Sequence, residues 1–272
     1  MTSVPGFLRT QTTGQPVLRL VDLFEESTEY KRSWYLPFNS LCFVAAEDSA
    51  DLSWVDLPEQ KIRLFYQEGS AYFTTCNTPM QIRYTKANLH YCIHFRFELF
   101  PGVDLFSGIH KRYIVKNKKI IERIAETFTL SDPLKKNVMA ESAALETALD
   151  FWPDQLPLNI KEMEQFSRLL EYVKLNLNNQ LGVARMAAFM GWSEDYFLRK
   201  FHKVFHTTPK QYLVRELLAE ILELLKDPNK SLKQIAEELK FSSEFNFSRF
   251  VRHYAGNSPS ELRRRYLYEV GK

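Results

Sequence analysis

The chain has 272 residues, of which 45% are apolar, 14% aromatic and 25% charged, so it is long enough for two domains with separate cores. This composition excludes a largely disordered chain, and the lack of an apolar run of signal-peptide or membrane-span length predicts a cytoplasmic protein without a membrane segment. The net charge of +3 is uneven, because the residues from Asn159 onward hold 19 Lys and Arg against 14 Asp and Glu, which leaves the rest mildly acidic.

The segment from Leu41 to Phe97 is predicted to be rich in β-structure. Short apolar or alternating runs recur there about every ten residues, separated by turn signals, which is typical of a sandwich or small barrel. After Pro101 the apolar period becomes helical, over 120–128 and again over 138–149. The runs read as strands are Leu41–Ala45, Ile62–Tyr66, Ala71–Phe73, Ile82–Tyr84 and Leu89–Phe97.

The segment from Trp152 to Pro157 is predicted to be a linker, because it holds two prolines and lacks periodicity. Beyond it nearly everything has helical periodicity. We therefore expect an α+β protein of two domains, with a β unit and trailing helices over 1–152, a linker over 153–159 and an all-α domain over 160–272.

The all-α domain contains a motif that occurs twice, about 50 residues apart. Each copy predicts a short helix, a tight turn opened by serine, and a second helix, over about 181–206 and about 231–256. This is the helix-turn-helix unit, which places its second helix in a DNA groove. The matching residues are Met186-Ala187, Phe197, Arg199 and Pro209 in the first copy, and Ile235-Ala236, Phe247, Arg249 and Pro259 in the second.

Serines open the predicted helices. Ser193 is expected to cap the second helix of the first unit, and Ser231 with Gln234 fits a capping box in the second unit. Helical spacing then separates a buried phenylalanine face from an outward face. The outward positions expected to contact DNA are Asp195, Leu198, Arg199, His202, Lys203, Phe245, Asn246, Ser248, Arg249 and Arg252.

These outward side chains suit base recognition. Arginine can fork onto guanine, asparagine can pair with adenine, and Phe245 or Leu198 can touch a thymine methyl group. The alternative is a stack of amphipathic helices with solvated faces. The repeat, with Phe, Arg and Pro recurring in step, favours DNA binding.

The second copy resembles the AraC/XylS transcriptional regulators, whose C-terminal domain carries two helix-turn-helix units. The resemblance extends from about Asn176 to Arg265. Lys240 and His206 depart from it, since glycine is usual at these positions and suits a left-handed turn, and so does Leu262, where an aromatic residue often follows the proline. The residues that carry the resemblance are Ile235-Ala236, Phe241, Phe247-Ser248-Arg249, Val251-Arg252, Gly256 and Ser258-Pro259.

The resemblance implies that the N-terminal half is a cupin-like β-barrel that binds a small effector and dimerises through helices. If the segment from His90 to Phe97 is a strand, its even-numbered positions share one face. A pocket lined by arginine, histidine and tyrosine side chains suits a polyol or an acid equally. The effector positions implied are Arg63, Tyr72, Arg83, Tyr84, His90, His94 and Arg96.

A metal centre in the barrel is the alternative use of His90 and His94. A cupin centre needs further histidine or glutamate ligands, and the only other histidine in this half is His110. The cysteines, Cys42, Cys76 and Cys92, lack metal-ligand spacing and are expected to be reduced structural thiols. We therefore expect no metal, no cofactor and no catalytic residues.

Taken together, these observations predict a sequence-specific transcriptional regulator that binds promoter DNA and is controlled by a small molecule such as a sugar. We expect a homodimer with its seam on the helices between Asn117 and Phe151, and RNA polymerase as a further partner. Two alternatives stay open: a cupin-like metal enzyme with a DNA-binding appendix, and an architectural DNA-binding protein that needs no effector.

Overall fold

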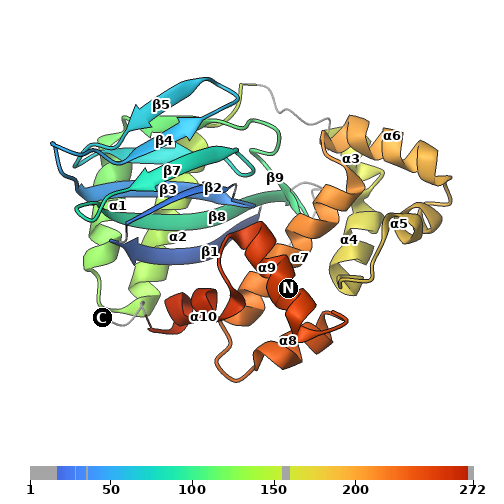
Figure 1. Cartoon of the computed structure of the whole chain (residues 1–272). Coiled ribbons are helices and arrows are strands. Elements are labelled where there is room, and N and C mark those ends of the chain that lie inside the picture. The colour runs from blue at the N-terminus through green and yellow to red at the C-terminus, as the bar shows by residue number, and fades with distance from the viewer. Residues whose placement is uncertain (1–16, 28, 35, 155–159, 269–272) are drawn as a thin grey trace, which may run out of the picture.

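The computed structural model describes residues 17–27, 29–34, 36–154 and 160–268. A β-rich N-terminal domain packs against a helical C-terminal domain (Figure 1). The strands are β1 (Val17–Glu26), β2 (Tyr30–Trp34), β3 (Asn39–Ala46), β4 (Trp54–Leu57), β5 (Ile62–Phe65), β6 (Ala71–Thr74), β7 (Met80–Tyr84), β8 (Leu89–Phe100), β9 (Val103–Asp104) and β10 (Arg112–Val115). The helices are α1 (Lys118–Thr129), α2 (Pro133–Asp150), α3 (Ile160–Glu164), α4 (Ser167–Asn176), α5 (Val183–Phe189), α6 (Glu194–Phe205), α7 (Pro209–Leu225), α8 (Leu232–Glu238), α9 (Glu244–Ala255) and α10 (Pro259–Tyr268).

The strands form two antiparallel sheets. One has the order β1-β8-β3-β6-β10 with β9 beside β8, and the other has the order β2-β7-β4-β5. Apolar side chains from both sheets, among them Val44, Val55 and Ile82, form one core cluster. Helices α1 and α2 contact strands of the first sheet and cover its other face (Figure 1). The predicted β unit with trailing helices is therefore confirmed.

Strand β8 shows how alternation divides the domain. His90, Cys92 and His94 are buried on one side, while Ile93 and Phe95 on the other side belong to the core beneath the helices. Cys42 of β3 lies directly opposite Cys92. The three cysteines are buried and free, and burial raises the pKa of both Cys76 and Cys92.

Helix α7 connects the two halves of the C-terminal domain, because its buried residues belong to two hydrophobic clusters. Tyr212 and Leu213 near its start pack with the first helix-turn-helix unit, whereas Leu218 and Ile221 further along pack with the second. Thr208 caps the helix in a capping box with Gln211. No helix among the described residues is both long and apolar enough to cross a membrane.

Several strands were not predicted, namely β1, β2, β4, β9 and β10, although β3 and β5 to β8 were. Of the predicted linker, residues 155–159 lie outside the described part of the chain. The all-α character of the region after it is confirmed.

Candidate nucleic-acid interface and effector pocket

The first helix-turn-helix unit consists of α5 and α6. The side chain of Ser193 accepts a hydrogen bond from the Tyr196 backbone amide, and so caps α6 as predicted. Phe197 and Phe201 are fully buried and hold α6 to its own domain. The turn before the cap passes through Gly191, whose φ is 69°.

The second unit, α8 and α9, repeats this construction. Ser231 and Gln234 form the predicted capping box of α8, and Ser243 caps α9 through the Asn246 backbone amide. Phe247 is fully buried, as Phe197 is in the first unit.

Each copy has two residues with a left-handed backbone, one in the turn and one at the end of the recognition helix. Each copy has glycine at only one of these two positions, and it is not the same position in both copies. Gly191 occupies the turn in the first copy, while the matching turn residue of the second is Lys240, with φ 55°. At the end of the recognition helix the order is reversed: His206 has φ 51° and Gly256 has φ 76°. The non-glycine residues therefore adopt the backbone conformation that glycine adopts in the other copy, at some energetic cost.

The outward faces of α6 and α9 are free of protein in the described part of the chain. Leu198 and Phe245 are exposed to 38% and 73%, so each helix presents apolar surface beside its basic side chains. Of the predicted DNA-contacting residues, Ser248 is half-buried. The exposed ones are Asp195, Leu198, Arg199, His202, Lys203, Phe245, Asn246, Arg249 and Arg252.

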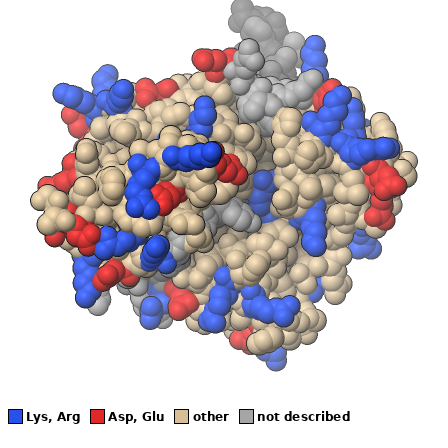
Figure 2. All heavy atoms as spheres, turned by 45° about the horizontal axis from the view of Figure 1, so that its top comes forward, with Lys and Arg blue, Asp and Glu red and all other residues tan. Residues whose placement is uncertain are grey.

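Charge on this surface is mixed. Figure 2 shows basic side chains gathered over the first helix-turn-helix unit, at the upper right, with acidic side chains beside them. Glu194 and Asp195 lie in the first turn of α6, where carboxylates interact favourably with the helix dipole. In the second unit, the Asn246 side-chain amide donates to the Ser242 hydroxyl at 2.6 Å, so it must exchange this bond to contact a base.

The predicted effector residues do not form one group. Tyr72, Tyr84, His90 and His94 face the space between the sheets. Arg63 and Arg83 lie on the outer surface, where each forms an ion pair. The pairs are Arg63 with Asp56 at 2.6 Å and Arg83 with Asp51 at 2.7 Å.

The space between the sheets is nearly full. His90 bonds to the side chain of Asn88 at 2.6 Å, and the ring of His94 packs 4.4 Å from that of Phe38, centroid to centroid. The remaining cavity has a volume of about 20 Å³, which suffices for about one water molecule. A ligand of sugar size does not fit there without rearrangement.

Sequence reasoning missed Arg112, which the fold places beside this interior. Its guanidinium donates to the Thr74 hydroxyl at 2.6 Å and to the Tyr66 hydroxyl at 2.8 Å. Burial raises the pKa of Tyr66, so this phenol remains protonated near neutral pH. The aromatic and β-branched run from Tyr113 to Val115, directly after Arg112, was the available signal for a strand.

Arg96 lies at the edge of the domain and points to α7. Its Nη1 donates to Glu216 at 3.0 Å and lies 3.4 Å from Glu98. Nearby, the Tyr212 hydroxyl donates to the Pro101 carbonyl at 3.0 Å. Gly102 has φ 70°, and a Cβ there would lie 2.5 Å from the Glu216 carboxyl carbon, so glycine permits the close approach.

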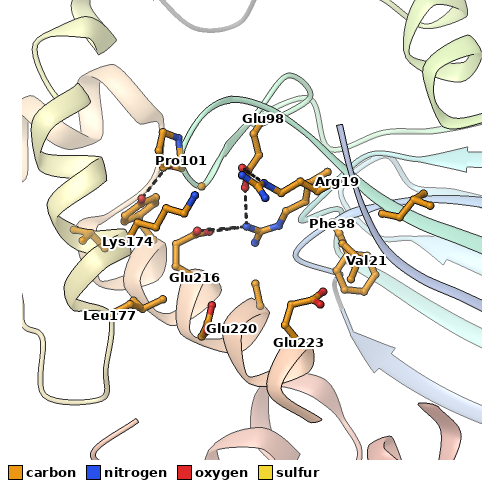
Figure 3. Close-up of a pocket in the computed structure, with 16 residues that line it drawn as sticks. Arg19, Val21, Phe38, Glu98, Pro101, Lys174, Leu177, Glu216, Glu220 and Glu223 are labelled. Carbon is orange, nitrogen blue, oxygen red and sulfur yellow. Dashed lines mark hydrogen bonds and ion pairs between the residues drawn. The ribbon is translucent and has the colours of Figure 1, made fainter. Parts of the chain in front are cut away.

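Beside these contacts lies a cavity of about 300 Å³, here named the domain-junction pocket (Figure 3). Glu216, Glu220 and Glu223 project towards it from α7, opposite residues of β1 and β8. Its charged lining residues are Arg19, Arg96, Lys174, Glu98, Glu216, Glu220 and Glu223. Acidic groups are in excess, and burial followed by the charges of Glu223 and Glu238 raises the pKa of Glu220.

This architecture defines a class: a β-domain joined to a pair of helix-turn-helix units with exposed recognition helices. Comparisons with known proteins agree. A family model described as a helix-turn-helix domain matches residues 186–265. This part of the chain is therefore similar to AraC-type helix-turn-helix domains, in agreement with the resemblance that the sequence repeat carries.

Similar sequences carry regulator names. YidL of Escherichia coli K12, an uncharacterized HTH-type transcriptional regulator, is 29% identical over 54% of this chain and 50% of its own length. The raffinose operon regulatory protein RafR of Pediococcus pentosaceus is 25% identical over 41% of this chain and 40% of its own. The chain thus spans half or less of the length of these relatives.

Solved structures of ToxT from Vibrio cholerae share the whole fold. One apo form has a TM-score of 0.62 at 11% identity, covering 92% of this chain and 97% of that one. Another, described as bound to an unsaturated fatty acid, has a TM-score of 0.58 at 10% identity, covering 93% and 96%. At such identities the likeness establishes the architecture alone.

Proposed function

We propose that this protein is a non-enzymatic, sequence-specific DNA-binding regulator of transcription, controlled by a small molecule. The observation that carries the proposal is the pair of exposed recognition faces on α6 and α9, where Arg199 and Arg249 lie at matching positions of a repeat and each face also presents an exposed apolar side chain. Such faces suit two successive major grooves, about 34 Å apart along the duplex.

The predicted contacts divide into two kinds. Arg199 and Arg249 lie at the same position of the repeat, on the exposed sides of their helices, and are proposed to read guanine. Lys203 and Arg252, each in the last turn of its recognition helix, are proposed to contact phosphate or the adjacent base. The affinity is therefore expected to fall steeply with salt concentration.

A competition experiment tests this function. The full-length protein is titrated onto a selected DNA site in the presence of excess random duplex, alongside the double variant Arg199→Ala/Arg249→Ala. Arg63→Ala is the matched control, because Arg63 is exposed on the N-terminal domain and far from the helices in sequence. We expect the parent and control to keep their preference and the double variant to lose it; equal binding to random DNA by the parent favours the architectural alternative.

The domain-junction pocket is proposed as the effector site. Its volume is near the lower end of the range typical of ligand pockets, roughly 300–1,000 Å³, and its walls come from both domains. An effector there can bias regulation only if it binds the alternative domain arrangements with different affinities. The excess of carboxylates suits a hydroxyl-rich ligand such as a sugar better than another carboxylate.

We extend the proposal to a homodimer formed through α2. Leu134 and Val138 are exposed to 78% and 67%, and Leu145 and Leu149 continue the same apolar stripe about two and three turns further on. A second copy of this stripe is a self-complementary partner. The dimer bound to a promoter is proposed to alter the access of RNA polymerase.

The seam is tested by light scattering coupled to gel filtration. Val138→Glu places a charge inside the stripe and is expected to yield monomers. Asn137→Glu, one residue away on an exposed position outside the stripe, is the control and is expected to leave the dimer intact. A monomeric parent would remove this part of the proposal.

A further inference from the structure

A second cavity, of about 400 Å³, lies at the start of α7 and is here named the α7-start pocket. Its walls come from loops of the N-terminal domain, from the turn between α6 and α7, from α7 itself and from α9. It therefore borders both helix-turn-helix units and the β-domain. The lining residues that matter are Asn77, Ser107, His110, Thr207, Lys210, Arg215 and Tyr254.

The charge of this pocket is opposite to that of the domain-junction pocket. Lys210, Arg215, His110 and His206 line it, and no carboxylate does among the residues described. The nearest carboxylate to His110 belongs to Glu59, at 3.6 Å, outside the lining. A concave surface with cations and no acids concentrates small anions.

Among these residues, Arg215 gives the strongest indication of an anion site. It is half-buried, yet within the described ranges its guanidinium makes no hydrogen bond or ion pair. Its charge is flanked by that of Arg96 as well as Glu216. A guanidinium that is partly removed from water and has no protein acceptor is well placed to bind an anion with two or more oxygens.

Asn77 supplies a complementary feature. Its side-chain oxygen is buried and accepts no hydrogen bond among the described residues. Asn77, His110 and His206 all have left-handed backbone conformations, with φ of 59°, 48° and 51°. Such conformations cost free energy and are concentrated at functional sites. The pocket thus offers unused donors on Arg215, and the unpaired Asn77 oxygen lies buried in its wall, where it can accept a hydrogen bond only after the amide turns.

We propose that the α7-start pocket binds a small anion that carries hydroxyl groups, with its phosphate or carboxylate on Arg215 and Lys210. Ser107 and Thr207 also line the pocket; the Thr207 hydroxyl, which donates to Gln211 at 3.3 Å, must exchange this bond to donate to the anion. The ring of Tyr254 forms an apolar wall. This site is distinct from the proposed effector pocket and gives the regulator a second input.

The expected regulatory effect rests on the proposed function. Because Tyr254 belongs to α9 and Thr207 follows α6, an anion held in the pocket ties the two recognition helices to the loops of the N-terminal domain. Anion binding and DNA binding are then coupled reciprocally.

Binding is measured on the full-length protein without DNA, so its result does not depend on the regulator function. Isothermal titration is performed at constant ionic strength with inorganic phosphate, glucose 6-phosphate, citrate and uncharged glucose. We expect one saturable anion per chain, tighter for glucose 6-phosphate or citrate than for phosphate, and no binding of glucose at this site. The better of the two larger anions distinguishes a phosphate ligand from a carboxylate ligand.

Substitutions of the lining residues test whether the anion binds in the α7-start pocket. Arg215→Gln is expected to weaken anion binding tenfold or more, because it removes charge-assisted bonds. Lys210→Gln, an exposed position that folding does not require, is expected to weaken it several-fold and serves where Arg215→Gln fails to fold. Arg252→Gln on the DNA face and Lys174→Gln in the domain-junction pocket are matched controls, and both should bind as the parent does.

Either of two results overturns the proposal: no saturable binding of any anion, or the same loss in Arg252→Gln as in Lys210→Gln. A separate gel-shift measurement on the same proteins reports on the regulator function. Anion binding with no DNA binding leaves the site in place and contradicts the proposed function, whereas DNA binding with no anion binding does the reverse.

Discussion

Arg96 of β8 and Glu216 of α7, 120 residues apart in the chain, form an ion pair across the two domains, with 3.0 Å between Nη1 and Oε1. Burial by itself lowers the pKa of Arg96, but the charges of Glu216 and Glu98 outweigh it and raise that pKa. Arg19 extends the network by pairing with Glu98 at 2.9 Å. The relative position of the two domains therefore depends on charges that face one another at their junction.

Removing one partner of this pair is expected to destabilise the protein. Glu216→Gln leaves a largely buried guanidinium with only a longer contact to Glu98, so we expect a loss of about 1–3 kcal/mol in the free energy of unfolding. Urea denaturation of Arg96→Gln, Glu216→Gln and the double variant measures the coupling between them. Additive losses in the double variant would show that the pair does not hold the domains together.

Substitutions at the two equivalent left-handed turns, Lys240→Gly and Gly191→Ala, are expected to change the free energy of unfolding in opposite directions. Lys240→Gly relieves a left-handed lysine at a cost of about 1–2 kcal/mol, partly offset by about 0.5–1 kcal/mol of glycine entropy, for a net gain of roughly 0.5 kcal/mol. Gly191→Ala at the equivalent turn has open space around the added methyl group and should lose about 1 kcal/mol through φ alone. Thermal unfolding of both variants checks this, and a destabilised Lys240→Gly would contradict it.

Phe245 is expected to act in DNA binding and not in folding. With 73% of the residue exposed, Phe245→Ala should leave the unfolding midpoint within error of the parent and weaken DNA binding several-fold. Phe65→Ala is the control, since Phe65 is 49% exposed on the N-terminal domain and should change neither property. Unaltered DNA affinity in Phe245→Ala would remove this residue from the interface.

The raised pKa of Glu220 predicts that the stability of the folded protein depends on pH. Burial and then its acidic neighbours raise the pKa of this carboxyl group in the folded state, so the folded protein binds the proton more strongly than the unfolded chain. Stability contributed by Glu220 is therefore fully present below its ordinary pKa, about 4.3, and is lost as the pH rises through the raised value. Glu220→Gln should be more stable than the parent at pH 7, with the difference vanishing near pH 4 in urea titrations. A difference independent of pH would show that the charge is not responsible.

Local signals in the sequence were sufficient for the DNA-binding domain. Caps at Ser193 and Ser231, the buried phenylalanines and the repeat itself act within a turn or two of helix, so they can be read without knowing the tertiary structure. Lys240 was correctly identified as a residue at a left-handed turn, and its φ of 55° confirms this.

The N-terminal half was harder because its predicted site depends on which residues face each other across strands. Arg83 and Tyr84 are neighbours on β7, so alternation places them on opposite sides, and only Tyr84 faces inward. The role of Arg96 at the domain junction had no local signal at all, since its partner lies 120 residues away. Both pockets between domains are likewise products of tertiary packing.

The central claim is that one chain reads DNA with two matched helices, and selection of binding sites from random duplexes tests it most directly. The parent should select two short sequence blocks about one helical turn apart, because its recognition helices enter successive major grooves. Arg199→Ala should lose information in one block and Arg249→Ala in the other, each at a cost of about 1–3 kcal/mol for the affected base pair. Selection of a single block, or the same change in both variants, would contradict the account.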